Sequence, residues 1–123
     1  MTSIRTVGFT GVALALTLTA TGCAMTAPST VELTDDAVVI DVRTAEEYAS
    51  AHLDRAVLLD VSNGDLAAAL TDLDPDVPYF VHCRSGNRSA QAVAMMRDAG
   101  FTDVTDLGSL EQASEATGLP IER

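Results

Sequence analysis

Short apolar runs and amphipathic segments alternate along most of the chain. Runs rich in Val, Ile, Leu and aromatic residues are typical of buried strands, and segments with helical spacing or helix-end residues are typical of helices. This alternation predicts an α/β fold, with a central parallel sheet of four to five strands and helices on both faces. The predicted strands are residues 37–42, 56–61, 78–83 and 102–107, and the predicted helices are residues 44–48, 66–73, 89–100 and 110–117.

Capping residues mark the ends of two of these helices. Thr44, followed three residues later by Glu47, forms a capping-box pattern at the start of the first helix. Ser89 is the expected N-cap of the third helix, and Gly100 is its expected C-terminal stop. The third helix therefore follows directly on the segment HCRSGNRS, residues 82–89.

The first 22 residues have a different composition from the rest of the chain. A short head carrying Arg5 precedes an uncharged run, whose densest apolar part is residues 12–18. That part is too short for a membrane span, which needs roughly 20 apolar residues, and it is typical of a secretory signal peptide. The sequence LTATGC, which ends at Cys23, resembles the lipobox of bacterial lipoproteins.

The lipobox resemblance implies a lipid-anchored protein. Cleavage would remove residues 1–22 as a lipoprotein signal peptide and leave a lipid-modified Cys23, a short tether over residues 23–30 and one domain over 31–123. Several acyl chains on one cysteine give stable attachment without a membrane-spanning helix. We therefore expect an extracytoplasmic protein, anchored to the cell membrane on its outer face or in a periplasm. The alternative is an ordinary signal peptide that happens to contain a cysteine.

Acidic residues dominate the segment that follows the predicted signal peptide. It holds six arginines and no lysine against all 18 acidic residues of the chain, which gives a formal charge of −12. Such a charge repels nucleic acid, which we exclude as a partner. Arg84 and Arg88 nevertheless stand within five residues of Cys83. This arrangement favours a small anion beside the cysteine, and the alternative is that both arginines pair with neighbouring carboxylates.

Cys83 is the candidate nucleophile, and the alternative is a small buried residue. With Cys23 lipidated it is the only remaining thiol, so no internal disulfide is expected. It follows a predicted parallel strand, at the end where α/β sheets bind ligands, and it precedes a helix N-terminus. The loop N–H groups, with Gly86 and Asn87 free to adopt unusual conformations, can form a nest for an anion. These features lower the pKa of a cysteine and favour its thiolate.

Three segments resemble a single-domain rhodanese, a sulfurtransferase of the thiosulfate type. They are VVIDVRTAEEYASAHL, VHCRSGNRSAQAVAMMRDAGFTDVTDLGSL and TGLPI, within residues 37–121. The resemblance implies that Cys83 takes the outer sulfur of thiosulfate, releases sulfite and holds a persulfide that a thiol or cyanide later removes. It implies no cofactor. The substrate-binding residues would be those of the loop: Arg84, Ser85, Gly86, Asn87 and Arg88.

The same resemblance assigns supporting roles to other residues. Asp41 and Arg43 would be structural, with Arg43 held by Asp41 or by Glu47. His52 would serve in packing or hydrogen bonding. His82 precedes Cys83 in a strand, so its side chain is expected on the opposite face of the sheet. Neither histidine has a metal-ligand neighbour at suitable spacing, and no metal site is expected.

Two other functions stay open on the sequence alone. Protein-tyrosine-type phosphatases place a cysteine and an arginine in a C-x5-R loop, whereas Cys83 and Arg88 have C-x4-R spacing. The shorter spacing gives a tighter loop, better suited to a sulfane sulfur than to a tetrahedral phosphate. A rhodanese-like domain can also be a non-catalytic module that binds a partner or senses oxidants through Cys83, because a fold alone does not establish a function.

Overall fold

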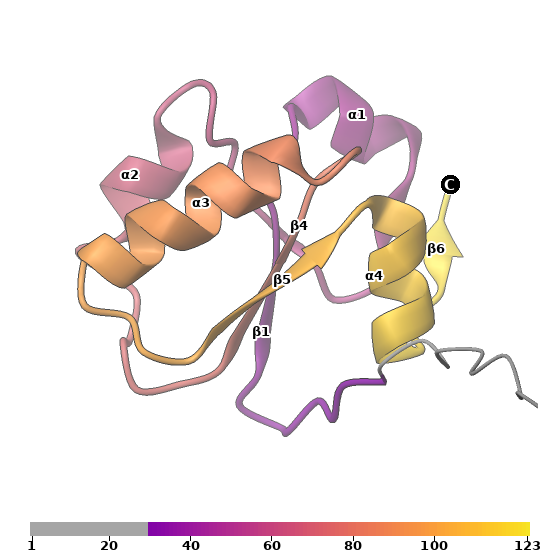
Figure 1. Ribbon diagram of the computed structural model, residues 1–123. Coiled ribbons are helices and arrows are strands. Elements are labelled where there is room, and N and C mark those ends of the chain that lie inside the picture. Colours follow the sequence, from indigo (N-terminus) through magenta and orange to yellow (C-terminus); the bar gives the residue numbers. More distant parts are fainter. Residues whose placement is uncertain (1–29) are drawn as a thin grey trace, which may run out of the picture.

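Strands and helices alternate along residues 30–123, the part of the chain that the computed structural model describes (Figure 1). The elements in chain order are β1 (Val38–Asp41), α1 (Ala45–Ser50), β2 (His52–Leu53), β3 (Val57–Leu58), α2 (Asp65–Ala69), β4 (Tyr79–His82), α3 (Asn87–Asp98), β5 (Val104–Gly108), α4 (Leu110–Thr117) and β6 (Ile121–Glu122).

The central sheet has four strands in the order β3-β1-β4-β5, and all its neighbours are parallel. After β1 the chain adds β3 on one side, and then crosses to the other side of β1 to form β4 and β5. The ends of β1 and β4 therefore lie side by side, with Asp41 paired to His82. Open α/β sheets bind ligands outside the carboxyl ends of their strands at such a change of direction. The predicted α/β fold with a parallel sheet is confirmed.

Alternate residues of the central strands enter two separate cores, because successive strand side chains point to opposite faces. Helices cover both faces, as the sequence predicts, with α2 and α3 on one side and α4 on the other (Figure 1). The core under α2 and α3 includes Ile40, Val42, Leu66, Tyr79, Val81, Val93 and Met96. The core under α4 includes Val39, Leu53, Phe80, Leu107, Leu110 and Ala113, with Tyr48 of α1 packed against it.

Helix α3 begins earlier than predicted. Its N-cap is Gly86, which has a φ of 97°, and the prediction of Ser89 as the N-cap is wrong. Glycine adopts this left-handed conformation without strain. Because it has no side chain, it makes no side-chain hydrogen bond to cap the helix. Ser89 lies in the first turn, where it is buried, and its hydroxyl donates to the Gly86 carbonyl at 3.0 Å. The other end agrees with the sequence, since Gly100, with a φ of 99°, directly follows the C-cap.

Very short strands account for the other main differences. Only Val57 and Leu58 of the predicted strand 56–61 have strand pairing with β1, although the Leu59 and Val61 N–H groups still donate to the Asp41 and Val42 carbonyls at 2.9 and 3.2 Å. The strands β2 and β6 form a separate antiparallel pair that the sequence pattern does not predict. Two-residue strands are too short to show a period, so no hydrophobic pattern marks them.

The predicted signal peptide, Cys23 and nearly all of the predicted tether lie outside the described residues, which begin at Thr30. Within residues 30–123, no helix has both the length and the apolar composition that a membrane crossing requires.

Candidate active site around Cys83

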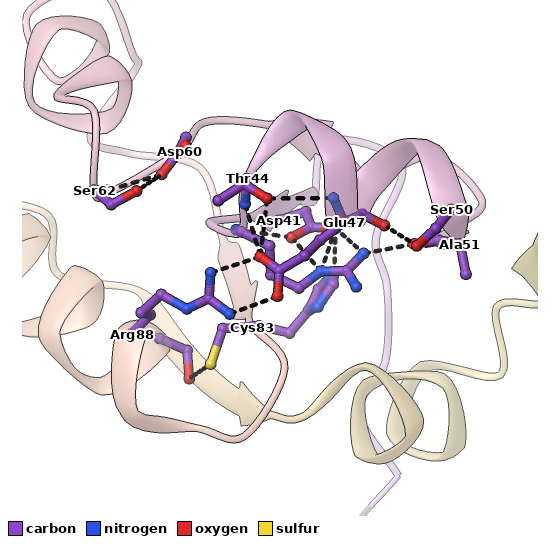
Figure 2. Close-up of polar contacts among 12 residues, drawn as sticks. Asp41, Thr44, Glu47, Ser50, Ala51, Asp60, Ser62, Cys83 and Arg88 are labelled. Carbon is purple, nitrogen blue, oxygen red and sulfur yellow. Dashed lines mark hydrogen bonds and ion pairs between the residues drawn. The ribbon is translucent and has the colours of Figure 1, made fainter.

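Cys83 lies at the carboxyl edge of the central sheet, directly after β4. Its N–H donates to the Gly108 carbonyl at 2.9 Å, which fixes the residue against the end of β5. The paired ends of β1 and β4 adjoin it, at the change of direction in the sheet. In Figure 2, Cys83 lies beside the contact between Glu47 of α1 and Arg88 of α3. The fold thus places the cysteine where α/β sheets bind their ligands.

The loop after Cys83 turns back so that its backbone contacts the sulfur. The Gly86 N–H lies 2.9 Å from the Cys83 sulfur and donates to it. The positive φ of Gly86 aims this N–H inward and starts α3, whose N-terminus adds partial positive charge. One N–H of the loop thus contacts the sulfur, and binding of an anion by the loop N–H groups stays a prediction.

Ser89 is the second group that contacts the sulfur. Its hydroxyl oxygen lies 3.6 Å from the Cys83 sulfur, and both side chains are fully buried. The same hydroxyl donates to the Gly86 carbonyl. Sequence reasoning assigned Ser89 only to helix capping. Its place in the first turn of a helix whose N-cap is Gly86 is the feature that would have pointed to this role.

The pKa of the Cys83 thiol is lowered, although two opposing effects act on it. Burial is the largest effect and raises the pKa, but hydrogen bonds from the Ser89 side chain and backbone, and from the backbone of Gly86 and Ser85, together outweigh it. Cys83 is therefore buried, as one of the two possibilities for it predicts, and its surroundings lower the pKa of its thiol. Its role as a nucleophile stays a prediction.

Arg88 is paired across the loop rather than free. Its two terminal nitrogens donate to the two carboxylate oxygens of Glu47 at 2.7 and 2.9 Å. The hydrogen bond from Arg88 is the main reason that the pKa of Glu47 falls from 4.5 to about 2, and Glu47 raises the pKa of Arg88 in turn. Glu47 also completes the predicted capping box with Thr44. Thiosulfate binding by Arg88 stays a prediction. It requires the arginine to release the Glu47 carboxylate and to bind thiosulfate in its place.

Asp41 and Arg43 form a buried pair at the end of β1. Of the two carboxylates considered for Arg43, the structure places Asp41 against it, with nitrogen–oxygen distances of 2.9 Å and 2.7 Å. Arg43 also donates to the Ala51 carbonyl at 2.6 Å. The pair ties the end of β1 to the segment after α1, which borders the loop, and this geometry suits the supporting role expected from the sequence.

Both histidines lie away from the cysteine sulfur. His82 is fully buried and faces Asp41 at 3.9 Å, on the opposite side of the sheet from Cys83. Burial lowers the pKa of His82, which favours the neutral ring. His52 stacks on Tyr48 at 4.0 Å, with its Nδ1 2.9 Å from the Tyr48 carbonyl. No group of three or more His, Cys, Asp or Glu within residues 30–123 is arranged to hold a metal ion.

The remaining predicted site residues, Arg84, Ser85 and Asn87, are exposed on the outer side of the loop. Within residues 30–123 the Arg84 guanidinium makes no hydrogen bond or ion pair, so the alternative of carboxylate pairing applies to Arg88 and not to Arg84. A buried thiolate with a backbone cradle and an unpaired arginine beside it can attack a small electrophilic sulfur and hold it as a persulfide.

The family match and the similar proteins of known name point to the same family. The family description "Rhodanese-like domain" matches residues 28–116. The chain is 37% identical over 70 residues to the thiosulfate sulfurtransferase GlpE of Pseudomonas entomophila, a match that covers 57% of this chain and 62% of that protein. The chain thus spans about 62% of the length of this curated relative.

Solved structures agree with this family. A rhodanese with anions from E. coli superposes with a TM-score of 0.60 and 25% identity, covering 71% of this chain and 98% of that one. The Alr3790 protein from Anabaena superposes with a TM-score of 0.63 and 26% identity, covering 72% of this chain and 79% of that one.

Proposed function

The chain belongs to the rhodanese-like domain family, and from this premise we propose that it is a sulfurtransferase in which Cys83 carries the transferred sulfur. The observation that carries the proposal is the Cys83 sulfur itself, buried at the carboxyl edge of the sheet and accepting the Gly86 N–H at 2.9 Å. Hydrogen bonds to the sulfur lower the pKa of the Cys83 thiol and so increase the share of the nucleophilic thiolate at a given pH. Relatives named thiosulfate sulfurtransferase support thiosulfate as the donor.

The reaction has two half-steps, each of which transfers one sulfur atom. In the first, the Cys83 thiolate attacks the outer sulfur of thiosulfate, a sulfur–sulfur bond forms, and sulfite leaves with the electron pair of the broken bond. The product is a Cys83 persulfide anion, which the loop N–H groups can stabilise as they do the thiolate. In the second half-step, cyanide or a thiol attacks the outer sulfur, and the Cys83 thiolate is restored.

Intact mass spectrometry tests this proposal. The full chain with Cys23→Ser has Cys83 as its only cysteine. After incubation with thiosulfate we expect its mass to rise by one sulfur atom, and the gain to disappear after addition of cyanide. The further variant Cys83→Ser should show no gain. No adduct on a thiol that iodoacetamide still alkylates would contradict the sulfurtransferase and favour a non-catalytic module.

We further propose that the protein is held at the outer face of the cytoplasmic membrane, or in a periplasm, by lipid on Cys23. The support is the sequence LTATGC, which ends at Cys23 and follows an apolar run with a basic head. Cys23→Ser should move the protein from the membrane fraction to the soluble fraction. Cys83→Ser is the matched control, and it should leave the protein in the membrane fraction. Retention of the Cys23→Ser variant on membranes would rule out the lipid anchor.

A further inference from the structure

The turn between β3 and α2 carries the sequence SNGD, residues 62–65, on the surface of the molecule. Asn63 and Gly64 are both exposed, and Gly64 has a φ of 91°. The Asn63 side-chain oxygen accepts the Asp65 N–H at 2.9 Å. Asparagine forms this kind of turn readily, because its side chain reaches the backbone two residues further on. The side-chain amide of Asn63 is therefore folded back along the peptide bond to Gly64.

Three features of this turn favour attack by the Gly64 nitrogen on the side-chain amide carbon of Asn63. Within residues 30–123 the Gly64 N–H makes no hydrogen bond, so hydroxide can remove its proton. Gly64 has no Cβ, and no atom beyond the neighbouring residues lies within 4 Å of the position that a Cβ would take. The hydrogen bond from Asp65 polarises the Asn63 side-chain carbonyl and stabilises the negative charge that develops on its oxygen. The reacting groups are thus close together and open to solvent.

The second asparagine of the chain lacks these features. Asn87 is also exposed, but it is the first residue of α3, and Arg88 follows it. A helical backbone turns the next peptide nitrogen away from the asparagine side chain, and the Arg88 side chain crowds that nitrogen. The same molecule therefore holds a reactive asparagine and an exposed asparagine to compare with it.

We propose that Asn63 is a site of self-catalysed deamidation, at which the folded backbone converts the asparagine to aspartate and isoaspartate. The Gly64 nitrogen, once its proton has passed to hydroxide, attacks the side-chain amide carbon of Asn63. A carbon–nitrogen bond forms, the bond to the side-chain nitrogen breaks, and that nitrogen leaves as ammonia after taking a proton from water. Water then opens the five-membered imide at either of its two carbonyls. An amide is exchanged for a carboxylate without any oxidant or reductant, and the inference does not depend on the proposed sulfurtransferase function.

Isoaspartate at this position lengthens the main chain of the turn that positions α2. The turn lies between Asp60 and Leu66, whose N–H donates to the Asp60 carbonyl at 3.3 Å. Leu66 is fully buried in the core that also contains Cys83. An added main-chain atom between these two anchors loosens at least one of them. We therefore expect the deamidated protein to unfold at a lower urea concentration than fresh protein.

Peptide mapping of aged protein tests the proposal. The full chain with Cys23→Ser is kept at mildly alkaline pH and then cleaved with trypsin, which cuts after arginine and separates the two asparagines into peptides 56–84 and 85–88. We expect peptide 56–84 to gain the mass difference between an amide and a carboxylic acid. It should also incorporate oxygen-18 from labelled water and become a substrate for an isoaspartyl methyltransferase. Deamidation of peptide 85–88 should be at least about tenfold slower.

Two variants separate the roles of the residues in the turn. Asn63→Ser keeps a short side-chain acceptor for the Asp65 N–H but has no amide. It should show neither the mass gain nor the methylation, and its urea midpoint should not change with age. Gly64→Ala places a methyl group beside the attacking nitrogen, and we expect it to slow deamidation about tenfold.

A comparison with the unfolded chain tests the part played by the fold. Deamidation of Asn63 in native buffer, slowed by Gly64→Ala and not matched at Asn87, supports the proposal. If Asn63 reacts in guanidinium chloride and stays intact in native buffer, the turn protects the asparagine and the proposal is wrong. Equal rates at Asn63 and Asn87 in the folded chain would also overturn it, because the local structure would then make no difference.

Discussion

Ser89 has one hydroxyl proton and two acceptors within reach. The Gly86 carbonyl lies at 3.0 Å and the Cys83 sulfur at 3.6 Å. When Cys83 is a thiol, it can donate to the serine oxygen while the serine donates to Gly86. When Cys83 is ionised, the hydroxyl can rotate and donate to the sulfur instead, because a charged acceptor makes the stronger hydrogen bond. One buried serine thus serves both protonation states of the nucleophile.

Ser89→Ala should make the Cys83 thiol ionise at a higher pH. Loss of the hydroxyl removes the largest effect that lowers the pKa of Cys83, so the opposing effect of burial is less fully offset and the pKa rises. The rate of alkylation by iodoacetamide, measured against pH in the Cys23→Ser chain, should have a higher midpoint. At a pH below the midpoint of the unsubstituted protein we expect the rate to fall by about three- to tenfold, which corresponds to one hydrogen bond. Ser85→Ala is the control, since Ser85 acts through its backbone and should leave the midpoint in place.

Part of this site could be predicted from the sequence and part could not. The place of Cys83 followed from a strand before it and a helix after it, which are local patterns. The contact of Arg88 with Glu47 joins residues 41 positions apart, and no local pattern indicates it. The role of Ser89 was missed because serine also caps helices, and the sequence does not show that Gly86 starts this helix.

At the scale of elements, the contact between Glu47 and Arg88 joins α1 to α3 across the mouth of the loop. Its two short hydrogen bonds form between side chains that are less than a third exposed. The pKa of Glu47 is lowered from 4.5 to about 2, so its ionised form stabilises the folded state. That contribution is complete above the unfolded pKa near 4.5 and is lost as the pH falls through about 2.

Glu47→Gln should therefore destabilise the protein in a pH-dependent way. The glutamine can still accept the Thr44 N–H, so the change removes the contact with Arg88 and keeps the cap. We expect a loss of about 1 kcal/mol at pH 6 in urea unfolding, reduced from the full linkage value because the pair is partly exposed. The loss should shrink as the pH falls from 4.5 towards 2. Glu46→Gln, on the same helix and without an ion-pair partner within residues 30–123, should show no such dependence.

The same substitution bears on the predicted role of Arg88 in thiosulfate binding. Thiosulfate must compete with Glu47 for the arginine, so Glu47→Gln should free the guanidinium and lower the KM for thiosulfate by about fivefold. The reverse result, a KM that rises or stays equal, would indicate that Arg88 serves only to join the two helices. Steady-state kinetics with cyanide as acceptor measures this, with Glu46→Gln as the charge-matched reference.

Gly86 and Gly64 form a natural pair for testing the loop. Both are N-caps without a side-chain cap, with φ values of 97° and 91°. A Cβ on Gly86 would meet only the Gly108 Cα at 3.8 Å, and one on Gly64 would meet nothing within 4 Å. Alanine at either site is therefore strained by its backbone and not by a collision, and each should cost roughly 1–2 kcal/mol in urea unfolding.

Only Gly86→Ala should also change Cys83. Relief of the strain by a rotated backbone would turn the Gly86 N–H away from the sulfur, so alkylation of the thiol should need a higher pH. Gly64→Ala should lose stability with the thiol midpoint unaltered. Equal midpoints in the two variants would contradict the role of the Gly86 N–H.

Element types were predictable where a pattern was long enough. The start of α4 carries a capping box of Ser109 and Gln112, and its predicted bounds, residues 110–117, match those observed. The bounds of β3 and the existence of β2 and β6 were not predictable, because two-residue strands are defined by their partners and not by their own sequence. The same dependence on partners explains why the number of strands was harder to predict than the fold class.

At the scale of the whole molecule, the proposed function requires a strongly negative domain to bind an anion. The segment from Cys23 onward has a formal charge of −12. At low ionic strength, about 0.01 M, the Debye length is about 30 Å, so charge all over the domain acts on a ligand at the site. At about 0.15 M it is about 8 Å, and only nearby groups such as Arg84 still act. Salt thus removes the long-range repulsion before it removes the local attraction.

Persulfide formation from thiosulfate should therefore become faster as salt is added. We expect the second-order rate to rise by roughly two- to fourfold between about 0.01 and 0.15 M sodium chloride, because the dianion meets less repulsion. The measurement is mass-resolved loading of the Cys23→Ser chain at a pH above the thiol midpoint, where screening cannot change the thiolate fraction. Alkylation by neutral iodoacetamide under the same conditions should be nearly independent of salt. A loading rate that falls with salt would show that the local arginines, and not the net charge, govern the approach of the donor.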